Sequence, residues 1–175
     1  MGTKFAPVYA NLVLGYLEEK LYTDLEQIYD QEFANKFRSL WKRYLDDCFI
    51  FWENKTDINK IFHLLQNLHP KIKFTMETSK HELPFLDILI KKDITKITTD
   101  IYYKTTDTKQ YLHFKSSHER HTKVNLPYSL ARRICTIITD KDIRELRLKE
   151  LEKSLLERGY PKQLIMEGTR RAQNT

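Results

Sequence analysis

Apolar residues recur every three or four positions over 6–28, which is the spacing of a helix with one buried face. The apolar positions are Val8, Leu12, Tyr16, Leu17, Leu21, Leu25 and Ile28. Pro7 suits the first turn of such a helix, where a missing N–H costs nothing. The same periodicity over 58–68 predicts a second helix, which we expect Asp57 to cap and Pro70 to end.

Strand-like patterns occupy much of the middle of the chain. Aromatic and β-branched residues flank Asp46 and Asp47 within 43–52, which predicts a tight β-hairpin with the two acids at its turn. The segment before it, 29–42, is interpreted as a polar connection. Alternating or continuous apolar positions predict further strands over 72–77, 83–90 and 97–103.

Helical spacing returns in the last third of the chain and predicts helices over 127–138, 141–158 and 162–171. Gly159 and Pro161 interrupt the pattern between the last two. The whole pattern predicts an α+β fold that changes from mixed helices and strands to helices near 115–125. We therefore expect two domains, over 1–115 and 116–175.

Charge is distributed unevenly along the chain. Its 175 residues include 30 Lys or Arg and 24 Asp or Glu, a formal charge of +6. Residues 1–103 carry 14 basic and 15 acidic side chains, whereas residues 104–175 carry 16 and 9, so the excess lies in the C-terminal part. Such an excess favours a polyanionic partner, nucleic acid before membrane, although a solvated helical face accounts for it about equally well.

Composition excludes several classes of protein. Apolar residues make up 41% of the chain, which argues against disorder despite 31% charged residues. Cys48 and Cys135 form no CxxC pair, which fits a reduced intracellular compartment. The longest apolar run, over 48–52, is too short to span a bilayer, and no secretory signal follows Met1. We expect an intracellular protein without a membrane segment or a small-molecule cofactor.

Asp46 and Asp47 are the candidate catalytic residues. Nucleotidyl transfer needs carboxylates fixed a few ångströms apart to hold two Mg²⁺ ions, one activating the attacking 3′-hydroxyl and one stabilising the leaving pyrophosphate. A hairpin turn is one rigid way to present such groups. By itself the pair is weak evidence, because Asp favours turns for local hydrogen-bonding reasons.

Longer motifs surround this pair. Tyr44-Leu45-Asp46-Asp47 resembles the YxDD box of reverse transcriptases, and the segment over 2–12 resembles the loop and helix that precede the box in those enzymes. Further matching segments follow in the same order, at 83–87, 111–114, 117–118, 121–123 and 127–129. Together they resemble the reverse transcriptases of Penelope-like retroelements, which are transposable elements, over nearly the whole chain.

The resemblance implies part of an RNA-directed DNA polymerase, with a palm followed by a helical thumb that begins near Pro127. Asp46 and Asp47 would bind Mg²⁺, and Tyr44 would lie beside the primer end or the template strand. The motif before the box would contact the incoming nucleotide and template base through Gly2, Lys4, Ala6, Pro7 and Asn11. The thumb would grip the template–primer duplex.

Two parts of a polymerase are missing from the sequence. The family carries a further metal-binding Asp and the basic fingers upstream of the first motif, and here only Met1 precedes that motif. Asp87 matches the later, primer-supporting region instead. We therefore expect an incomplete Mg²⁺ site and a fragment that contacts RNA template, DNA primer or hybrid duplex but has no polymerase activity alone.

Basic residues of the C-terminal part are the predicted nucleic-acid contacts. They are Lys115, Arg120, Lys123, Arg132, Arg133, Arg170 and Arg171. The pairs Arg132-Arg133 and Arg170-Arg171 lack acidic neighbours, which favours phosphate contacts over surface ion pairs.

His113, His118 and His121 lie close in sequence, with Cys135 beyond them. Their spacing matches no common zinc finger, and Cys135 lies in an apolar helical pattern, so zinc is the minor hypothesis. A loop that contacts nucleic-acid backbone is the favoured one, because basic residues interleave with the histidines.

A second functional hypothesis belongs to a different class. Residues 127–172 would act as a small helix-turn-helix-like module of a non-catalytic nucleic-acid-binding protein, with the strand-rich part as scaffold. A thumb favours primed duplex or RNA–DNA hybrid, whereas a helix-turn-helix favours duplex DNA with sequence dependence. Either ligand is typical of a nuclear protein. A relic that never folds is the third alternative.

Overall fold

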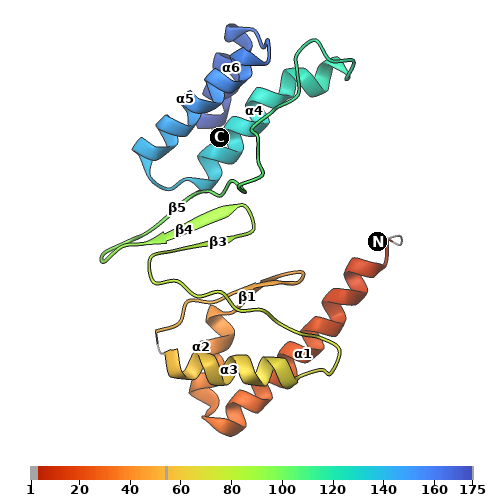
Figure 1. Cartoon of the computed structure of the whole chain (residues 1–175), viewed down its shortest axis with the longest axis vertical. Coiled ribbons are helices and arrows are strands. Elements are labelled where there is room, and N and C mark those ends of the chain that lie inside the picture. The colour runs from red at the N-terminus through yellow and green to blue at the C-terminus, as the bar shows by residue number, and fades with distance from the viewer. Residues whose placement is uncertain (1–3, 54, 175) are drawn as a thin grey trace. The chain divides into compact units, whose positions relative to one another are not determined.

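The computed structural model describes residues 4–53 and 55–174, which divide into two units, Met1–Thr78 and Ser79–Thr175 (Figure 1). Each unit has its own apolar core. Within the described residues the fold is α+β, as predicted, with six helices and two small antiparallel sheets. The chain passes from the first unit to the second after Thr78, and the second sheet belongs to the same unit as the C-terminal helices. The expected domains, over 1–115 and 116–175, stay a prediction.

The described part of the first unit packs three helices around one core. Its elements, in chain order, are α1 (Ala6–Ile28), α2 (Gln31–Leu40), β1 (Lys42–Tyr44), β2 (Asp47–Phe49) and α3 (Lys55–Asn67). Leu21 and Leu25 of α1, Phe37 of α2 and Ile61 of α3 are fully buried in the same cluster. Both helices predicted for this part of the chain are confirmed, but α3 begins at Lys55, so Asp57 lies in its first turn and does not cap it.

The helix α2 replaces the polar connection expected over 29–42. Asp30 caps it, because the carboxylate accepts a hydrogen bond from the N–H of Phe33 at 2.7 Å. Ala34 and Phe37 supply a short buried face. The expectation was wrong because a helix of ten residues can be held by its cap and by tertiary burial, without a long periodic pattern.

Residues 72–77 belong to no strand, so the strand predicted there is wrong. Ile72 and Phe74 do pack against the first core, which accounts for the alternating pattern. The backbone of Phe74 bonds to a side chain instead of a neighbouring strand, since Gln66 of α3 donates to its carbonyl oxygen and accepts from its N–H. The alternation of apolar and polar residues therefore reflects burial of the apolar side chains and not pairing with another strand.

The second unit consists of a three-stranded sheet followed by three helices. Its elements are β3 (Glu82–Phe85), β4 (Ile88–Lys92), β5 (Ile97–Ile101), α4 (Arg120–Ile137), α5 (Lys141–Glu157) and α6 (Lys162–Gln173). The strands form an antiparallel meander in the order β3-β4-β5. The single strand predicted over 83–90 is in fact two, because a turn at Leu86 and Asp87 separates them.

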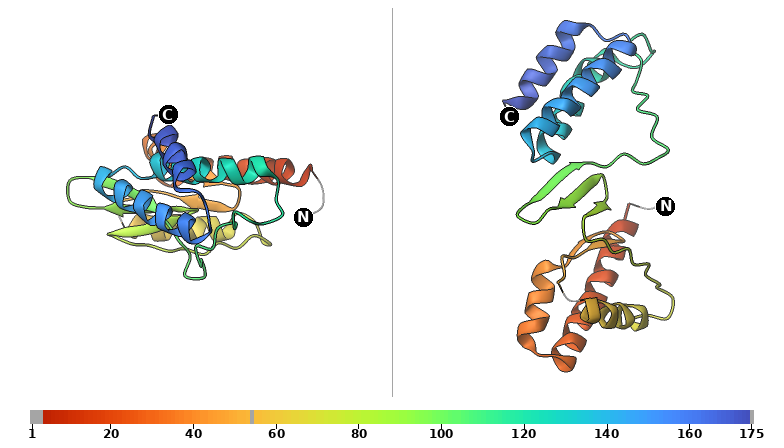
Figure 2. Two further views of the ribbon diagram at one scale, coloured as in Figure 1. Left: turned by 90° about the horizontal axis from the view of Figure 1, so that it is seen from above. Right: turned by 60° about the vertical axis from the view of Figure 1, so that its left-hand side comes forward.

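The predicted C-terminal helices are confirmed, but α4 begins seven residues earlier than expected. Pro127 was taken as a helix start, whereas it lies buried inside α4. Its ring nitrogen has no proton to donate to the carbonyl oxygen four residues earlier, and the helix tolerates this loss. Figures 1 and 2 show α4, α5 and α6 side by side.

The helices α4 and α6 approach each other closely at Gly168. A Cβ atom added there would lie 2.8 Å from the backbone nitrogen of Tyr128 and 3.1 Å from Cβ of Pro127. The absence of a side chain therefore lets the two backbones pack in contact. Ala131 of α4 and Ile165 of α6 are buried in the core of this unit.

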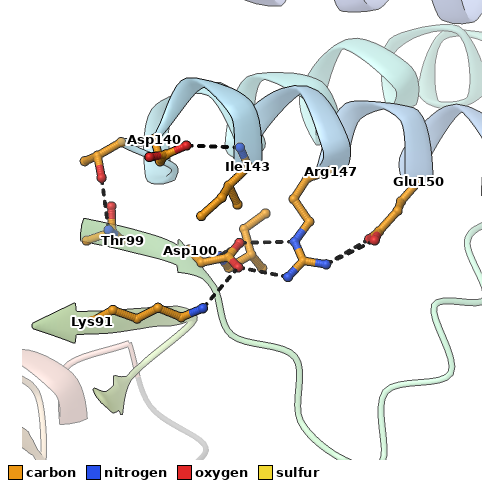
Figure 3. Close-up of polar contacts among 9 residues, drawn as sticks. Lys91, Thr99, Asp100, Asp140, Ile143, Arg147 and Glu150 are labelled. Carbon is orange, nitrogen blue, oxygen red and sulfur yellow. Dashed lines mark hydrogen bonds and ion pairs between the residues drawn. The ribbon is translucent and has the colours of Figure 1, made fainter. Parts of the chain in front are cut away.

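A buried ion pair attaches α5 to the sheet (Figure 3). Asp100 of β5 is 2% exposed and accepts from Nε and Nη2 of Arg147 at 3.2 and 2.8 Å. Arg147 also donates to Glu150 at 3.0 Å, and the ammonium of Lys91 lies 4.0 Å from Asp100. Burial by itself raises the pKa of the Asp100 carboxyl, but hydrogen bonds from Arg147 and from the N–H of Ile101 outweigh it. The pKa of Asp100 is therefore lowered from its ordinary value.

Asp100→Asn is expected to lower the free energy of unfolding by about 3 kcal/mol, because it leaves a largely buried guanidinium without its charged partner. Urea denaturation at neutral pH measures this loss. Asp142→Asn removes a carboxylate from the exposed first turn of α5 and is the control, with an expected change below about 1 kcal/mol. Equal stability of the two variants would contradict the role of the pair.

The stability difference between wild type and Asp100→Asn should depend on pH. Because the folded-state pKa of Asp100 is lowered, its contribution is complete above the unfolded-state pKa of about 3.9 and is lost as pH falls through the folded value. Denaturation curves at several pH values should show a constant difference above about pH 5 that shrinks below about pH 4. A difference that is unchanged in strong acid would exclude this linkage.

Gly168→Ala is expected to destabilise the protein by about 1–3 kcal/mol, because the new methyl group forces α4 and α6 apart. The control is Gly15→Ala in α1, where an added Cβ meets nothing within 4 Å. That variant should gain up to about 1 kcal/mol, since alanine favours a helix over glycine. Thermal melts of both variants test the pair, and a stabilised Gly168→Ala protein would contradict the close packing.

Candidate nucleic-acid interface

Four residues, 158–161, connect α5 to α6 and set the direction in which α6 leaves. The N–H of Gly159 donates to the carbonyl oxygen of Leu156 at 2.9 Å, and that of Tyr160 donates to Leu155 at 3.1 Å. These two bonds form a Schellman motif, which needs a left-handed residue at its second-to-last position, and Gly159 has a φ of 76°. The predicted break is confirmed, and its geometry is that of two helices joined by a tight turn.

The segment that precedes α4 packs on this turn. The N–H of Phe114 donates to the carbonyl oxygen of Arg158 at 2.9 Å, and its ring centroid lies 5.1 Å from that of the buried Tyr160. The ring of His113 lies 3.5 Å from the position that a Cβ of Gly159 would occupy. Residues 111–114 are therefore part of the helical module although they are not helical.

One face of α6 is buried and the opposite face is open. Ile165, Gly168 and Ala172 form the buried face. The exposed residues are Lys162, Gln163, Met166, Glu167, Arg170, Arg171 and Gln173. The open face begins directly after the turn and combines cationic, amide and thioether side chains, which are groups that can contact the edges of nucleic-acid bases.

The basic excess lies on two of the three helices. Within 120–137, α4 has four Lys or Arg and no Asp or Glu. In α5 the five basic and five acidic residues cancel, whereas α6 has three basic residues and one acidic. The positive surface of the module is thus made by α4 and α6, which also pack most closely on each other.

Two arginines from these helices meet at Tyr128. Arg132, one turn further along α4, donates from Nη1 to the Tyr128 hydroxyl at 3.0 Å. The guanidinium of Arg171 in α6 lies over the Tyr128 ring, 4.2 Å from its centroid. We call Tyr128, Arg132 and Arg171 the arginine–tyrosine cluster. Both arginines are exposed, and Tyr128 is half-buried.

Arg133 does have an acidic neighbour, contrary to the expectation from sequence. Its Nη2 lies 2.7 Å from Oδ2 of Asp87, in the turn between β3 and β4, and its Nε donates to the same oxygen at 3.0 Å. Asp87 is therefore in a turn rather than inside an apolar strand. The partner is distant in sequence, so neighbouring residues could not reveal it. A phosphate contact by Arg133 stays a prediction.

The basic residues in the loop before α4 and in its first turns differ in the contacts that they make. Lys123 donates from Nζ to the carbonyl oxygen of Ser116 at 2.8 Å, and its charge lies 6.0 Å from the ring centroid of Phe114. Lys115 and Arg120 are exposed. Lys123 thus fastens the loop to the helix, whereas the side chains of Lys115 and Arg120 face solvent.

The histidines of this loop make local contacts. Nδ1 of His113 accepts from the N–H of Lys115 at 3.1 Å, and Nδ1 of His118 lies 3.2 Å from the Ser116 hydroxyl. Across residues 4–53 and 55–174, the structure brings together no group of three or more His, Cys, Asp or Glu side chains that could hold a metal ion. This holds for His121 and Cys135 as well.

Asp46 and Asp47 lie at the predicted hairpin in the first unit. The strands β1 and β2 pair antiparallel, with Tyr44 opposite Asp47 and a turn at Leu45 and Asp46. Both carboxylates are exposed, and in the described part of the chain no third ligand joins them. Mg²⁺ binding by this pair stays a prediction that no contact tests.

The helix α1 and this hairpin are joined by Arg43. Its guanidinium donates to both carboxylate oxygens of Glu18, at 2.8 and 3.0 Å, and to Oδ1 of Asn11 at 2.9 Å. Asn11 therefore has a structural partner in the hairpin. Lys4, Ala6 and Pro7 lie at the start of α1. Gly2 falls outside the described residues.

The sequence predictions missed the open face of α6 apart from its two arginines, and they missed the contacts of Tyr128 with Arg132 and Arg171. Lys162 and Gln163 follow the break at Gly159 and Pro161. They therefore lie at the start of the second of two helices joined by a tight turn. This position was the signal in the sequence that could have identified them as candidate contacts to bases. No pattern in the sequence could show that Tyr128 and Arg171 meet.

One of the comparisons with known proteins gives a match, and this match lies in the C-terminal helical module. Residues 110–169, 60 of the 175, match the family model of the animal helix-turn-helix domain. The match begins at the segment that packs on the α5–α6 turn and extends into α6. No curated protein and no solved structure matches the chain. No described helix is both long and apolar enough to cross a membrane.

This match overturns the interpretation of the chain as part of a Penelope-like reverse transcriptase. No reverse-transcriptase family or homologue is found, and the helices expected to form a polymerase thumb lie in a helix-turn-helix match. The assignments of palm, thumb and RNA-directed DNA polymerase are therefore wrong. The motif around Asp46 and Asp47 is a hairpin turn, and the second hypothesis, a helix-turn-helix-like module, is the one that the finding favours.

Proposed function

We propose that the second unit binds duplex DNA through a helix-turn-helix formed by α5, the turn at 158–161 and α6. The observation that carries this proposal is the family match over 110–169, which includes α5, the turn and the first eight residues of α6. In helix-turn-helix proteins the second helix enters the major groove and its N-terminal residues contact base edges. In this chain that helix is α6.

The open face of α6 has the chemistry for such contacts. Gln163 can pair with the N6 and N7 atoms of adenine, and Lys162 can donate to O6 and N7 of guanine. Met166, one turn further, is 58% exposed and offers an apolar contact for a thymine methyl group. All three are exposed near the N-terminus of α6, and Arg170 continues the same face.

Exposed basic residues around this helix supply sequence-independent affinity. Lys115 and Arg120 lie on the loop and first turn of α4, and their charges would be neutralised by phosphates rather than by base edges. The net charge of the chain favours the same ligand. A duplex-DNA ligand also supports the nuclear location expected from the sequence.

The test starts with selection of a preferred site from randomised duplexes by the purified full chain. Fluorescence anisotropy then gives the Kd of wild type and Gln163→Ala for the selected duplex, for single-base-pair variants and for the matching RNA–DNA hybrid. We expect the duplex to be preferred, and Gln163→Ala to lose about 1–3 kcal/mol of discrimination at one base pair.

The matched control is Gln27→Ala on the exposed surface of α1, which should bind the selected duplex as wild type does. If the full chain selects no sequence, or prefers the hybrid, the proposal is wrong. If Gln163→Ala weakens all duplexes equally, α6 does not read bases.

A further inference from the structure

The arginine–tyrosine cluster lies beside the open face of α6, on the side where α6 packs against α4. Gly168 and Arg171 are three residues apart on α6, so the close approach of the two backbones brings Arg171 to Tyr128. Arg132 reaches the hydroxyl of the same tyrosine from the next turn of α4. Two cations from different helices are thereby held at one aromatic ring.

The surroundings of the cluster on α4 are cationic. The 18 residues of α4 contain no carboxylate side chain, and Arg132 forms no ion pair with a described residue. The neighbouring Arg133 differs, because Asp87 already binds its guanidinium. The two adjacent arginines of α4 therefore have different partners. Arg133 pairs with the carboxylate of Asp87, and Arg132 donates to the hydroxyl of Tyr128.

We propose that Arg132 and Arg171 bind the phosphate backbone of the same duplex that α6 reads, and that Tyr128 positions them. Guanidinium groups bind phosphate oxygens in paired hydrogen bonds, and fixing their planes in advance reduces the entropy lost on binding. The Tyr128 hydroxyl fixes Arg132, and its ring fixes Arg171. Because the cluster spans α4 and α6, it also sets the orientation of α6 on the duplex. This inference rests on the proposed function and assigns it a second contact surface.

The test measures duplex affinity of the full chain over a range of salt concentrations. Arg132→Gln and Arg171→Gln should each raise the Kd about tenfold on the selected duplex and on unrelated duplexes alike. Each should also reduce the slope of log K against log salt by about 0.9, the value for one lost phosphate contact. Tyr128→Phe keeps both charges and the ring but removes the hydroxyl that holds Arg132. It should raise the Kd about threefold, because the arginine–phosphate contact is weakened and not lost.

One control separates the loss of charge from the loss of the cluster. Lys153→Gln removes one exposed charge from α5. It should change the Kd less than twofold, and thermal melts should show that all variants fold. Wild-type Kd values for either cluster arginine variant, or an effect confined to one base pair, would overturn the proposal. An unchanged Tyr128→Phe would exclude the positioning role. Absence of duplex binding by wild type would instead refute the proposed function.

Discussion

The close approach of α4 and α6 at Gly168 is the constraint on which the rest of the second unit depends. Because no side chain separates the helices, the backbone of Tyr128 lies against α6, and the open face of α6 is turned away from the core. The Schellman motif at Gly159 sets where α6 begins, and the contact at Gly168 sets how it lies. This one packing contact places both the residues that we propose to read bases and those that we propose to bind phosphates.

The Asp100–Arg147 pair has a different part in the same unit. It attaches α5 to the sheet, so the first helix of the proposed helix-turn-helix is fixed to a three-stranded support. A buried pair of this kind adds little net stability compared with apolar packing, but the loss of one partner is costly. Its contribution is therefore one of geometry, since it holds α5 against β5 in a single position.

Much of the fold could be predicted from the sequence, because long amphipathic helices leave a clear pattern. The helix over 6–28 has the bounds that its apolar residues predict, and the break after α5 lies where Gly159 and Pro161 predict it. Short elements were not predicted. The helix α2 is stabilised by a cap at Asp30 and by burial of Phe37, although its sequence has no long periodic pattern. Alternation at Ile72 and Phe74 predicted burial but could not show what bonds their backbone.

The candidate site could be predicted only in part. Basic composition indicated the C-terminal helices, but which arginines are paired depends on contacts between residues far apart in sequence, such as Arg133 with Asp87. The four residues Tyr44-Leu45-Asp46-Asp47 form a turn between two short strands, and such a turn can carry an acidic pair for local reasons alone. A short motif at a turn was therefore a poor guide to function, whereas the helix-turn-helix match agrees with a surface that the fold builds.

If α6 lies in the major groove of duplex DNA, as proposed, methylation interference on the selected duplex will detect it. The N7 atom of guanine lies in the major groove, whereas the N3 atom of adenine lies in the minor groove. Methyl groups at guanine N7 within the site should then block binding of the full chain, whereas methyl groups at adenine N3 should not. Interference confined to adenine N3, or absent at every base, would contradict it.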